Sequence, residues 1–245
     1  VESTKHSNNI TFNDQIKIDI NEFKYSNKGI KILNKINFQI PKGTAIGIIG
    51  NSGAGKSTLI DIILGLLDVD NNSVTVDGIS INNNIISWQN KIGYVPQNIY
   101  LMDDTLVKNI AFGIKDELID NVSLVNSLKL AQLDKFVNEL SEGEQTFIGE
   151  NGARLSGGQK QRIGIARALY SKPEILVLDE STSALDHNTE KEILETIKNL
   201  KGAITSIIIS HKVDNLSFCD KILVIEEGNI SYFDNYNNLP DKYKN

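Results

Sequence analysis

The sequence predicts an α/β protein whose core is a doubly wound parallel β-sheet. Short, nearly all-apolar runs at residues 44–50, 174–180 and 205–210 are typical of parallel strands that helices cover on both faces. Apolar residues with helical spacing follow the first run at 57–67, where Leu66 completes the apolar face, and they recur at 187–200. This repeating strand–helix order is the pattern of a doubly wound fold.

Two segments with alternating apolar residues, 16–23 and 32–40, precede this core. Alternation of this kind indicates half-buried strands, so we expect an antiparallel β lobe at the front of the domain. The first fifteen residues are polar and without pattern. We therefore expect a tail or linker over 1–15 and one main domain over 16–245.

The middle of the chain breaks the strand–helix alternation. Helix-like stretches at 106–114 and 124–140 indicate a helical subdomain inserted over about 98–170. Near the end, the segment 220–233 predicts a β-hairpin that turns at Glu227 and Gly228.

The composition limits the function classes. The chain has 245 residues and a formal net charge of -6, so it offers no general attraction to a polyanion, and nucleic acid is not expected as a main partner. No apolar run approaches the roughly 20 residues that cross a bilayer, and the start lacks the pattern of a signal peptide. The single cysteine, Cys219, fits a reducing cytosol and is expected to be a small buried residue.

The segment GNSGAGKST at 50–58 matches the phosphate-loop pattern G-x-x-x-x-G-K-[ST]. A chance glycine-rich turn would also match, but here a predicted strand precedes the loop and a predicted helix follows it. Backbone N–H groups at that helix N-terminus would hold phosphate oxygens, Lys56 would reach the β and γ phosphates, and Ser57 would ligate magnesium. The nucleotide-binding residues expected from this loop are Asn51, Ser52, Gly53, Ala54, Gly55, Lys56, Ser57 and Thr58.

Four polar residues follow predicted strands whose ends should meet at one edge of the sheet. Asp179 could hold the metal, Glu180 could polarise an attacking water, His211 could donate to a γ-phosphate oxygen, and Gln97 could reach the metal or the water. Each alone is more often a cap, a turn or a surface residue. Beside a phosphate loop, the catalytic interpretation is favoured.

A second segment with phosphate-binding character begins at Ser156. Ser156, Gly157, Gly158 and Gln159 fit a capping box ahead of a helix whose Ile163, Ala166 and Leu169 share one face. A capped helix with no further role would explain this pattern. However, each glycine in a helix costs about 1 kcal/mol relative to alanine, and together they let another surface come close. Without a lysine, this helix N-terminus is half of an anion site.

The motifs GNSGAGKST, YVPQN, LSGGQ, ILVLDE, SALD and IISH occur in the order and spacing of the ATP-binding cassette of ABC transporters. The sequence resembles this family over nearly its whole length, which implies a P-loop NTPase with a RecA-like core, ATP as the nucleotide and Mg²⁺ as the metal. In the family, cassettes pair head to tail, so the resemblance also implies a second and identical cassette whose Ser156–Gln159 segment closes over the γ-phosphate.

The resemblance implies further roles. Tyr25 would stack on adenine, Ser183 to Asp186 would bridge the two cassettes, and Gln97 would lie on the loop that senses the membrane partner. The catalytic set is complete, which implies two equal sites in a homodimer; it comprises Lys56, Gln97, Glu180 and His211.

Within the family, TFIGENGARLSGGQ at 146–159 and DDTLVKNIAFG at 103–113 resemble exporters. This implies that Gly149–Gly152 contacts a transmembrane domain that precedes the cassette on one chain, at the cytoplasmic face of a bacterial inner membrane. The stretch 92–106 resembles flippases for lipid-linked oligosaccharides.

Three alternatives stay open. A separately encoded importer ATPase suits the length of the chain, but the TFIGENG loop argues against it. A DNA-repair or chromosome-organising clamp is disfavoured, because fewer than 100 residues without heptads separate the phosphate loop from LSGGQ and the charge is acidic. A scaffold that binds nucleotide without cleaving it is disfavoured by Glu180 and His211.

Overall fold

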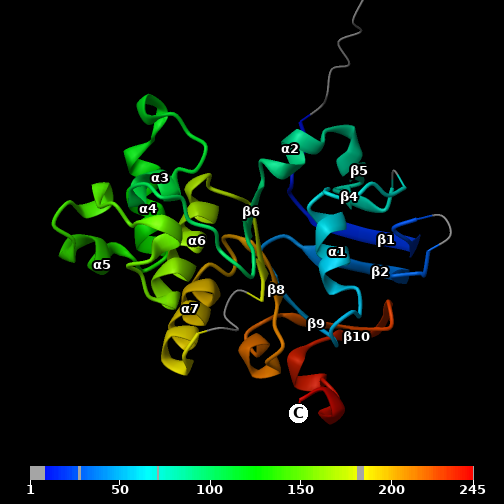
Figure 1. Cartoon of the computed structure of the whole chain (residues 1–245). Helices are drawn as coiled ribbons and strands as arrows, with labels where there is room; N and C mark the ends of the chain where they lie inside the picture. Colours follow the sequence, from blue (N-terminus) through cyan, green and yellow to red (C-terminus); the bar gives the residue numbers. More distant parts are fainter. Residues whose placement is uncertain (1–8, 27–28, 71, 181–184, 245) are drawn as a thin grey trace, which may run out of the picture.

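The structure, a computed structural model, describes residues 9–26, 29–70, 72–180 and 185–244, and its strands form two sheets (Figure 1). The first sheet is antiparallel, in the order β2-β1-β4-β5, and comprises β1 (Gln15–Phe23), β2 (Leu33–Pro41), β4 (Val74–Val76) and β5 (Ile79–Ser80). The second sheet runs in the order β10-β9-β3-β8-β7-β6, and its first strand pair is antiparallel while the other pairs are parallel. Its strands are β3 (Ala45–Ile49), β6 (Ile92–Val95), β7 (Ile175–Asp179), β8 (Thr205–Ile209), β9 (Lys221–Glu226) and β10 (Asn229–Asp234).

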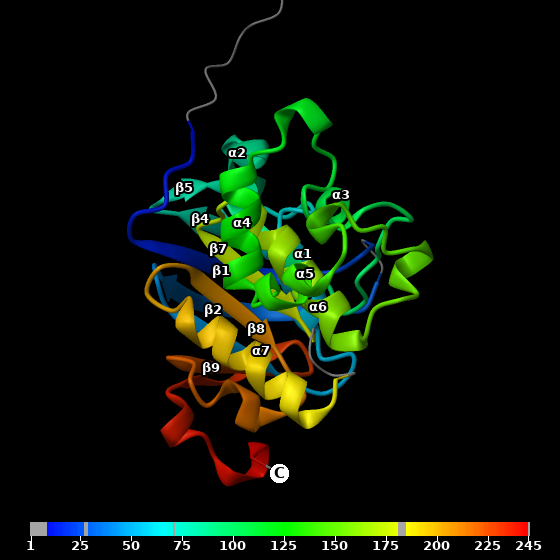
Figure 2. The same ribbon diagram turned by 90° about the vertical axis from the view of Figure 1, so that its left-hand side faces the viewer.

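The described residues contain seven α-helices. They are α1 (Lys56–Ile63), α2 (Ile85–Gln89), α3 (Leu106–Ile110), α4 (Asn121–Leu130), α5 (Asp134–Glu139), α6 (Gly157–Tyr170) and α7 (His187–Asn199). Helices α3 to α6 lie together on one side of the molecule, and Figure 2 shows α4 to α7 in front of the sheets. None of the helices in the described part of the chain has the length and apolar character needed to cross a membrane.

The parallel sheet lies between two hydrophobic cores, as the all-apolar strands predict. Ile46 and Ile48 of β3 pack in a core with α1 and the antiparallel lobe, whereas Ala45 and Ile49 of the same strand pack in a core with α6 and α7. Every residue of β3 is buried. The predicted α/β class and the front β lobe are therefore confirmed.

The antiparallel lobe begins earlier than the expected tail allows. Ile10 and Phe12 are each 1% exposed and belong to the same core as Ile16. The carboxylate of Asp77 accepts hydrogen bonds from the backbone N–H groups of residues 13, 14 and 15. Residues 9–14 are thus part of the lobe, and the expectation of a tail up to residue 15 is wrong for them. Two apolar residues among polar neighbours were too weak a pattern to indicate this.

Helix α1 ends before the predicted residue 67. Gly65 adopts a left-handed φ of 68° after the last turn. The N–H groups of Gly65 and Leu66 donate to the carbonyls of Ile62 and Asp61, which is the hydrogen-bond pattern of a Schellman motif. Leu66, expected on the apolar helical face, is therefore outside the helix and 61% exposed.

Other predicted elements match more closely. β9 and β10 form the predicted hairpin, and both Glu227 and Gly228 have the positive φ that a type I′ turn requires. Cys219 is buried, and burial raises the pKa of its thiol to about 12. The helical stretch predicted over 124–140 divides into α4 and α5, because Gln132 takes a φ of 54° between them. The division of the chain into domains, with a helical subdomain over about 98–170, stays an interpretation.

We expect Trp88 to stabilise the contact between α2 and α1. Its ring is fully buried, and its indole N–H donates to the carbonyl of Ile63 over 2.7 Å. Trp88→Phe removes the donor and part of the buried volume, so the free energy of unfolding should fall by about 2–3 kcal/mol. Urea unfolding followed by circular dichroism measures this change. Ile86→Ala, on the same helix but at a 69% exposed position, should cost less than about 0.5 kcal/mol; equal losses in the two variants would contradict the assignment.

Candidate functional site

The predicted phosphate loop and the residues Gln97, Asp179, Glu180 and His211 come together because four neighbouring strands end at one edge of the sheet. The strands β3, β8, β7 and β6 are adjacent and parallel, so their carboxyl ends share that edge. The glycine loop follows β3, His211 follows β8, Asp179 ends β7, and Gln97 follows β6. In open α/β sheets this edge is where ligands bind.

The glycine loop needs its glycines for steric reasons. Gly55 precedes the first residue of α1 with a φ of 103°, and a Cβ there would lie 2.7 Å from Cδ2 of Leu33. A Cβ at Gly50 would lie 2.3 Å from the carbonyl oxygen of Ile225. Side chains at these two positions would displace the loop from the sheet. Within the loop, Ala54, Gly55, Lys56 and Thr58 are buried, and Asn51, Ser52, Gly53 and Ser57 are exposed.

Lys56 is folded onto the loop that carries it. Its Nζ donates to the carbonyl oxygens of Gly50 at 2.8 Å and of Asn51 at 3.1 Å. Burial lowers the pKa of Lys56, and the nearby carboxylates of Glu180 and Asp179 oppose that shift. Lys56 and Glu180 line the same hollow.

Glu180 lies between two other residues that the sequence predicts at the site, Gln97 and His211. Its Oε2 accepts from the amide of Gln97 at 2.9 Å, and its Oε1 lies 2.6 Å from Nε2 of His211. The Glu180 side chain is 16% exposed. Its backbone adopts a φ of 47°, a strained conformation for a residue with a side chain. Three predicted residues from three strand ends thus meet at one carboxylate.

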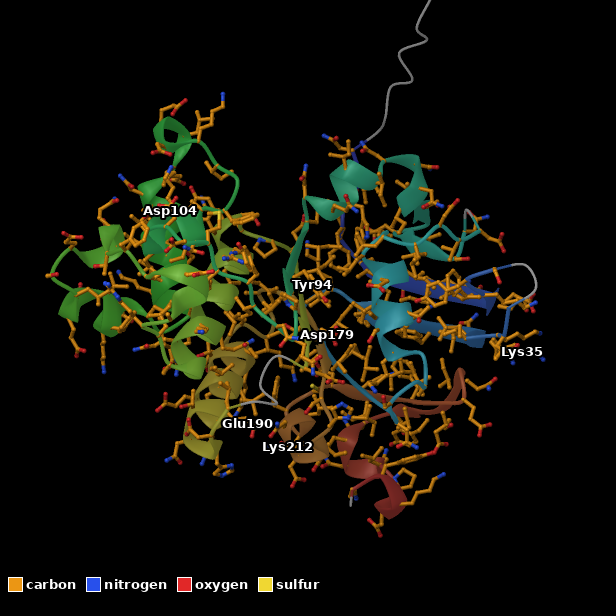
Figure 3. The ribbon with its side chains drawn as sticks, in the orientation of Figure 1. Lys35, Tyr94, Asp104, Asp179, Glu190 and Lys212 are labelled. Atoms are coloured by element: carbon orange, nitrogen blue, oxygen red, sulfur yellow. The ribbon has the colours of Figure 1, made fainter. Side chains whose placement is uncertain are left out.

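Asp179 has a different environment from Glu180, although the two are adjacent. Its Oδ2 accepts a hydrogen bond of 3.4 Å from the hydroxyl of Tyr94, on β6 (Figure 3). Burial first, and then the charge of Glu180, raise the pKa of Asp179, whereas the Tyr94 hydrogen bond lowers it. Burial and the Asp179 carboxylate raise the pKa of Tyr94 to about 12. Tyr94 was not predicted; its position on a strand next to β7 is the signal that could have indicated it.

Most of the predicted residues line one open hollow of about 500 Å³. Tyr25 lies at this hollow, is 63% exposed, and its hydroxyl shares a hydrogen bond of 3.0 Å with Oγ1 of Thr58. The edge of the Phe23 ring contacts the Tyr25 ring at 5.2 Å between centroids. The hollow is lined by Tyr25, Ile32, Ser52, Gly53, Gly55, Lys56, Ser57, Thr58, Gln97, Glu180 and His211.

The segment Ser156–Gln159 is not among the residues that line this hollow. It forms the predicted capping box at the start of α6: Ser156 Oγ accepts from the N–H of Gln159 at 3.2 Å, and the Gln159 side chain accepts from the N–H of Ser156 at 2.8 Å. Its two glycines differ. A Cβ at Gly157 would make an ordinary contact of 3.5 Å with Leu185, but a Cβ at Gly158 would lie 2.4 Å from Cγ2 of Thr189.

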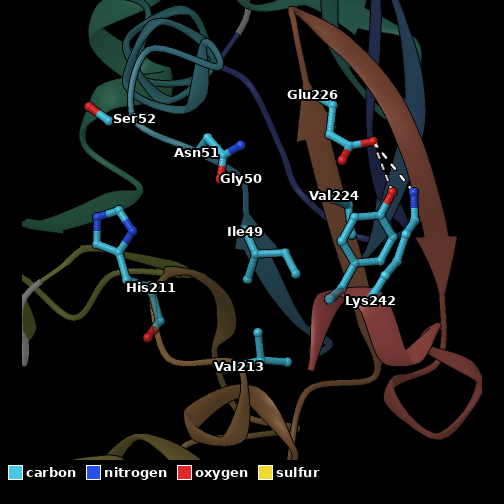
Figure 4. Close-up of a pocket in the computed structure, with 11 residues that line it drawn as sticks. Ile49, Gly50, Asn51, Ser52, His211, Val213, Val224, Glu226 and Lys242 are labelled. Carbon is cyan, nitrogen blue, oxygen red and sulfur yellow. Dashed lines mark hydrogen bonds and ion pairs between the residues drawn. The ribbon is translucent and has the colours of Figure 1, made fainter. Parts of the chain in front are cut away.

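A second hollow, of about 420 Å³, lies beside the start of the glycine loop (Figure 4). Asn51, Ser52 and His211 line it together with C-terminal residues that the sequence analysis did not single out. The Tyr243 hydroxyl donates to Glu226 at 2.9 Å, and Lys242 Nζ lies 3.9 Å from the same carboxylate.

For the remaining predicted residues, the structure describes only the local backbone and cap contacts. Gly149 precedes the short 3₁₀ helix Glu150–Gly152. Of the segment expected to bridge two cassettes, Ser183 and Ala184 lie outside the described residues, and Asp186 caps α7 by accepting from the N–H of Thr189 at 3.1 Å.

Comparison with known proteins identifies the family. Residues 33–183 match the ABC transporter family. The chain is 40% identical over 217 residues to an ATP-dependent lipid A-core flippase of Saccharophagus degradans. This match covers 88% of this chain and 37% of that protein. The lipid A-core flippase of Escherichia coli K12 is 37% identical over 218 residues, with 89% of this chain and 37% of the relative covered.

A solved structure of a bacterial Atm1-family ABC exporter with ATP bound matches this fold with a TM-score of 0.84 and 33% identity, over 95% of this chain and 41% of that chain. The chain thus spans less than half the length of the relatives it matches. The sequence match, the two sheets and the order of the motifs around one sheet edge lead to one conclusion: the chain belongs to the ABC transporter family and is a nucleotide-binding domain of that family.

Proposed function

We propose that this chain is the ATP-hydrolysing domain of a bacterial exporter, acting at the cytoplasmic face of the membrane. The observation that carries the proposal is the Glu180 carboxylate, held by Gln97 and His211 beside Lys56. The relatives are more than twice as long as this chain, and they are named as flippases and as an exporter. Their greater length supports a further domain on the same full-length chain, and we propose that it is a transmembrane domain that precedes the cassette and contacts Gly149–Gly152.

ATP is the substrate that the hollow fits best. The exposed face of the loop from Asn51 to Ser57 presents the N-terminus of α1 to an anion. Lys56 would exchange the carbonyls of Gly50 and Asn51 for the β and γ phosphates. Tyr25, at the same hollow and largely exposed, offers its ring to the adenine base.

The donor set also fits Mg²⁺, which prefers oxygen ligands and retains phosphate and water oxygens around it. Ser57, Gln97 and Asp179 supply a hydroxyl, an amide and a carboxylate at the same sheet edge. The pKa of Asp179 is raised in part by the charge of Glu180, and a cation held by Asp179 would relieve that repulsion. When bound, the metal would supply charge stabilisation to the phosphoryl oxygens.

Glu180 would accept a proton from the attacking water. As the water oxygen bonds to the γ-phosphorus, the bond to the oxygen that bridges to the β-phosphate breaks, and ADP leaves. His211 would donate to a γ-phosphate oxygen, and Gln97 would hold the water in line.

The hollow of one chain would be completed by a second cassette. Ser156–Gln159 forms a capped helix N-terminus with an accessible glycine, and this segment does not line the hollow of its own chain. We propose that two identical cassettes pair head to tail, with the Ser156–Gln159 segment of each over the γ-phosphate of the other. ATP binding would close the pair, and hydrolysis would open it.

The relatives favour a lipid-linked molecule as the transported substrate, since two of them are named lipid A-core flippases. The importer alternative has no comparable support among these relatives. A role on DNA is not supported by the acidic charge of the chain.

Replacing Glu180 with Gln tests the catalytic assignment. The amide keeps the size of the side chain and one acceptor oxygen but cannot take a proton, so ATP turnover should fall by about 100-fold or more. ATP should still bind, and the ATP-bound dimer should accumulate in size-exclusion chromatography with light scattering. Glu139→Gln, an exposed position on α5, is the matched control and should keep the wild-type rate. Normal turnover in Glu180→Gln would remove Glu180 from the mechanism.

Mixing two inactive variants tests the shared site. Lys56→Ala removes the phosphate contact, and Gly157→Asp places a negative charge where the partner's γ-phosphate would lie, at a position with room for a side chain. Neither variant alone should hydrolyse ATP. In an equal mixture, half of the dimers are mixed and each keeps one intact site, so roughly a quarter of the wild-type activity should return. A mixture as inactive as its components would contradict head-to-tail pairing, and Gly157→Ala should stay active as the control for added bulk.

A further inference from the structure

A buried carboxylate outside the site fixes the loop that carries His211. Glu190 lies in the first turn of α7 and is 2% exposed. One of its oxygens accepts from Nζ of Lys212 at 2.6 Å, and the other accepts from the amide of Asn215 at 2.8 Å. Lys212 is the residue directly after His211, and Asn215 lies in the short 3₁₀ helix Val213–Leu216. Both oxygens of Glu190 therefore hold the chain just beyond His211 (Figure 3).

The chain before His211 is held to the sheet, because the N–H of Ser210 donates to the carbonyl of Ile48 at 3.3 Å. Strand β8 ends at Ile209, and Oγ of Ser210 accepts from the N–H of Lys212 and donates to its carbonyl, each at 3.0 Å. The side chain of His211 is 49% exposed, and its Nε2 is nevertheless 2.6 Å from Glu180. Because little packing surrounds this ring, its place depends on how firmly its backbone is held on both sides.

The helix that holds the His211 loop also packs against the helix that begins at Ser156. Thr189, directly before Glu190, lies so close to Gly158 that no side chain would fit there. Arg162 of α6 pairs with Glu192 of α7 at 2.6 Å. Helix α7 thus lies between the N-terminal end of α6 and the His211 loop, and Glu190 is its contact to the loop.

We propose that Glu190 is a positioning residue for His211, tying the loop 210–216 to α7 and so setting the imidazole against Glu180. The inference rests on the proposed function in one respect, the part of His211 in hydrolysis. Burying a carboxylate is costly, and an apolar residue of similar volume would fill the space at lower cost, so packing alone does not explain a charge here.

Resonances of the His211 imidazole test the proposal without any need for activity. The full chain has three histidines, and His211→Gln identifies the signals of His211 by their loss. In Glu190→Gln the His211 signals should shift or broaden. The amide has an N–H group in place of one of the two acceptor oxygens, so one of the two hydrogen bonds to the loop is lost. Glu195→Gln is the matched control on the same helix. Glu195 is exposed and pairs with Lys198 at 3.4 Å, so this change should leave the His211 signals in place. Lys212→Met breaks the same ion pair from a side chain that is 57% exposed and should reproduce the shift, even where Glu190→Gln unfolds.

Kinetics then show whether the position matters. Glu190→Gln should lower kcat for ATP by about 10-fold to 100-fold, with KM within about twofold, because misplacement affects the reacting geometry more than binding. In a His211→Ala background the same change should cost nothing further. Losses that multiply in the double variant, or unchanged His211 signals in a folded Glu190→Gln chain, would overturn the proposal. A wild-type chain without ATP hydrolysis would instead contradict the proposed function, and the resonances would still report the position of His211.

Discussion

The parallel pairing of β3, β8, β7 and β6 is the constraint on which the site depends. In the register of β7 and β8, Asp179 lies beside Ile209, so the residues after both strands emerge side by side. A slip of one residue would move Glu180 by about 3.3 Å relative to His211 and would turn every side chain of the strand to the other core. Close packing of these side chains in the two cores opposes that slip. The same apolar contacts that stabilise the sheet therefore also set the distance of 2.6 Å between Glu180 and His211.

The backbone conformation of Glu180 gives the two adjacent carboxylates, Asp179 and Glu180, different surroundings. Asp179 still belongs to β7 and is hydrogen-bonded by Tyr94, while Glu180 turns away with a φ of 47°. Such a conformation costs on the order of 1–3 kcal/mol and persists where surrounding contacts hold it. Here the N–H of Glu180 donates to the carbonyl of Ile209 at 3.2 Å, and its side chain is held at both oxygens. Neighbouring acids in different environments can perform different tasks.

The sequence predicted those parts of the fold that carry a long or repeated pattern. The all-apolar strands, the capping box at Ser156 and the hairpin at Glu227 are local signals. β4, β5 and α2 contain three, two and five residues, too few for a period to be recognised. The contacts of Tyr94 and of Glu190 could not be predicted, because they join residues 85 and 22 positions apart that only the packed sheet and helices bring together.

The two glycines of the Ser156–Gln159 segment have different neighbours at the N-terminus of α6. Gly157 has room on its outer side, whereas Gly158 is needed because α7 lies against it at Thr189. A surface that pressed on Gly157 from outside would therefore bear on α7 through Gly158. Glu190 follows Thr189 on that helix, and its hydrogen bonds lead to the loop of His211. A helix N-terminus without a lysine thus has a chain of contacts to the Glu180 carboxylate of its own chain, in addition to the nucleotide that it would meet in another under the proposed pairing.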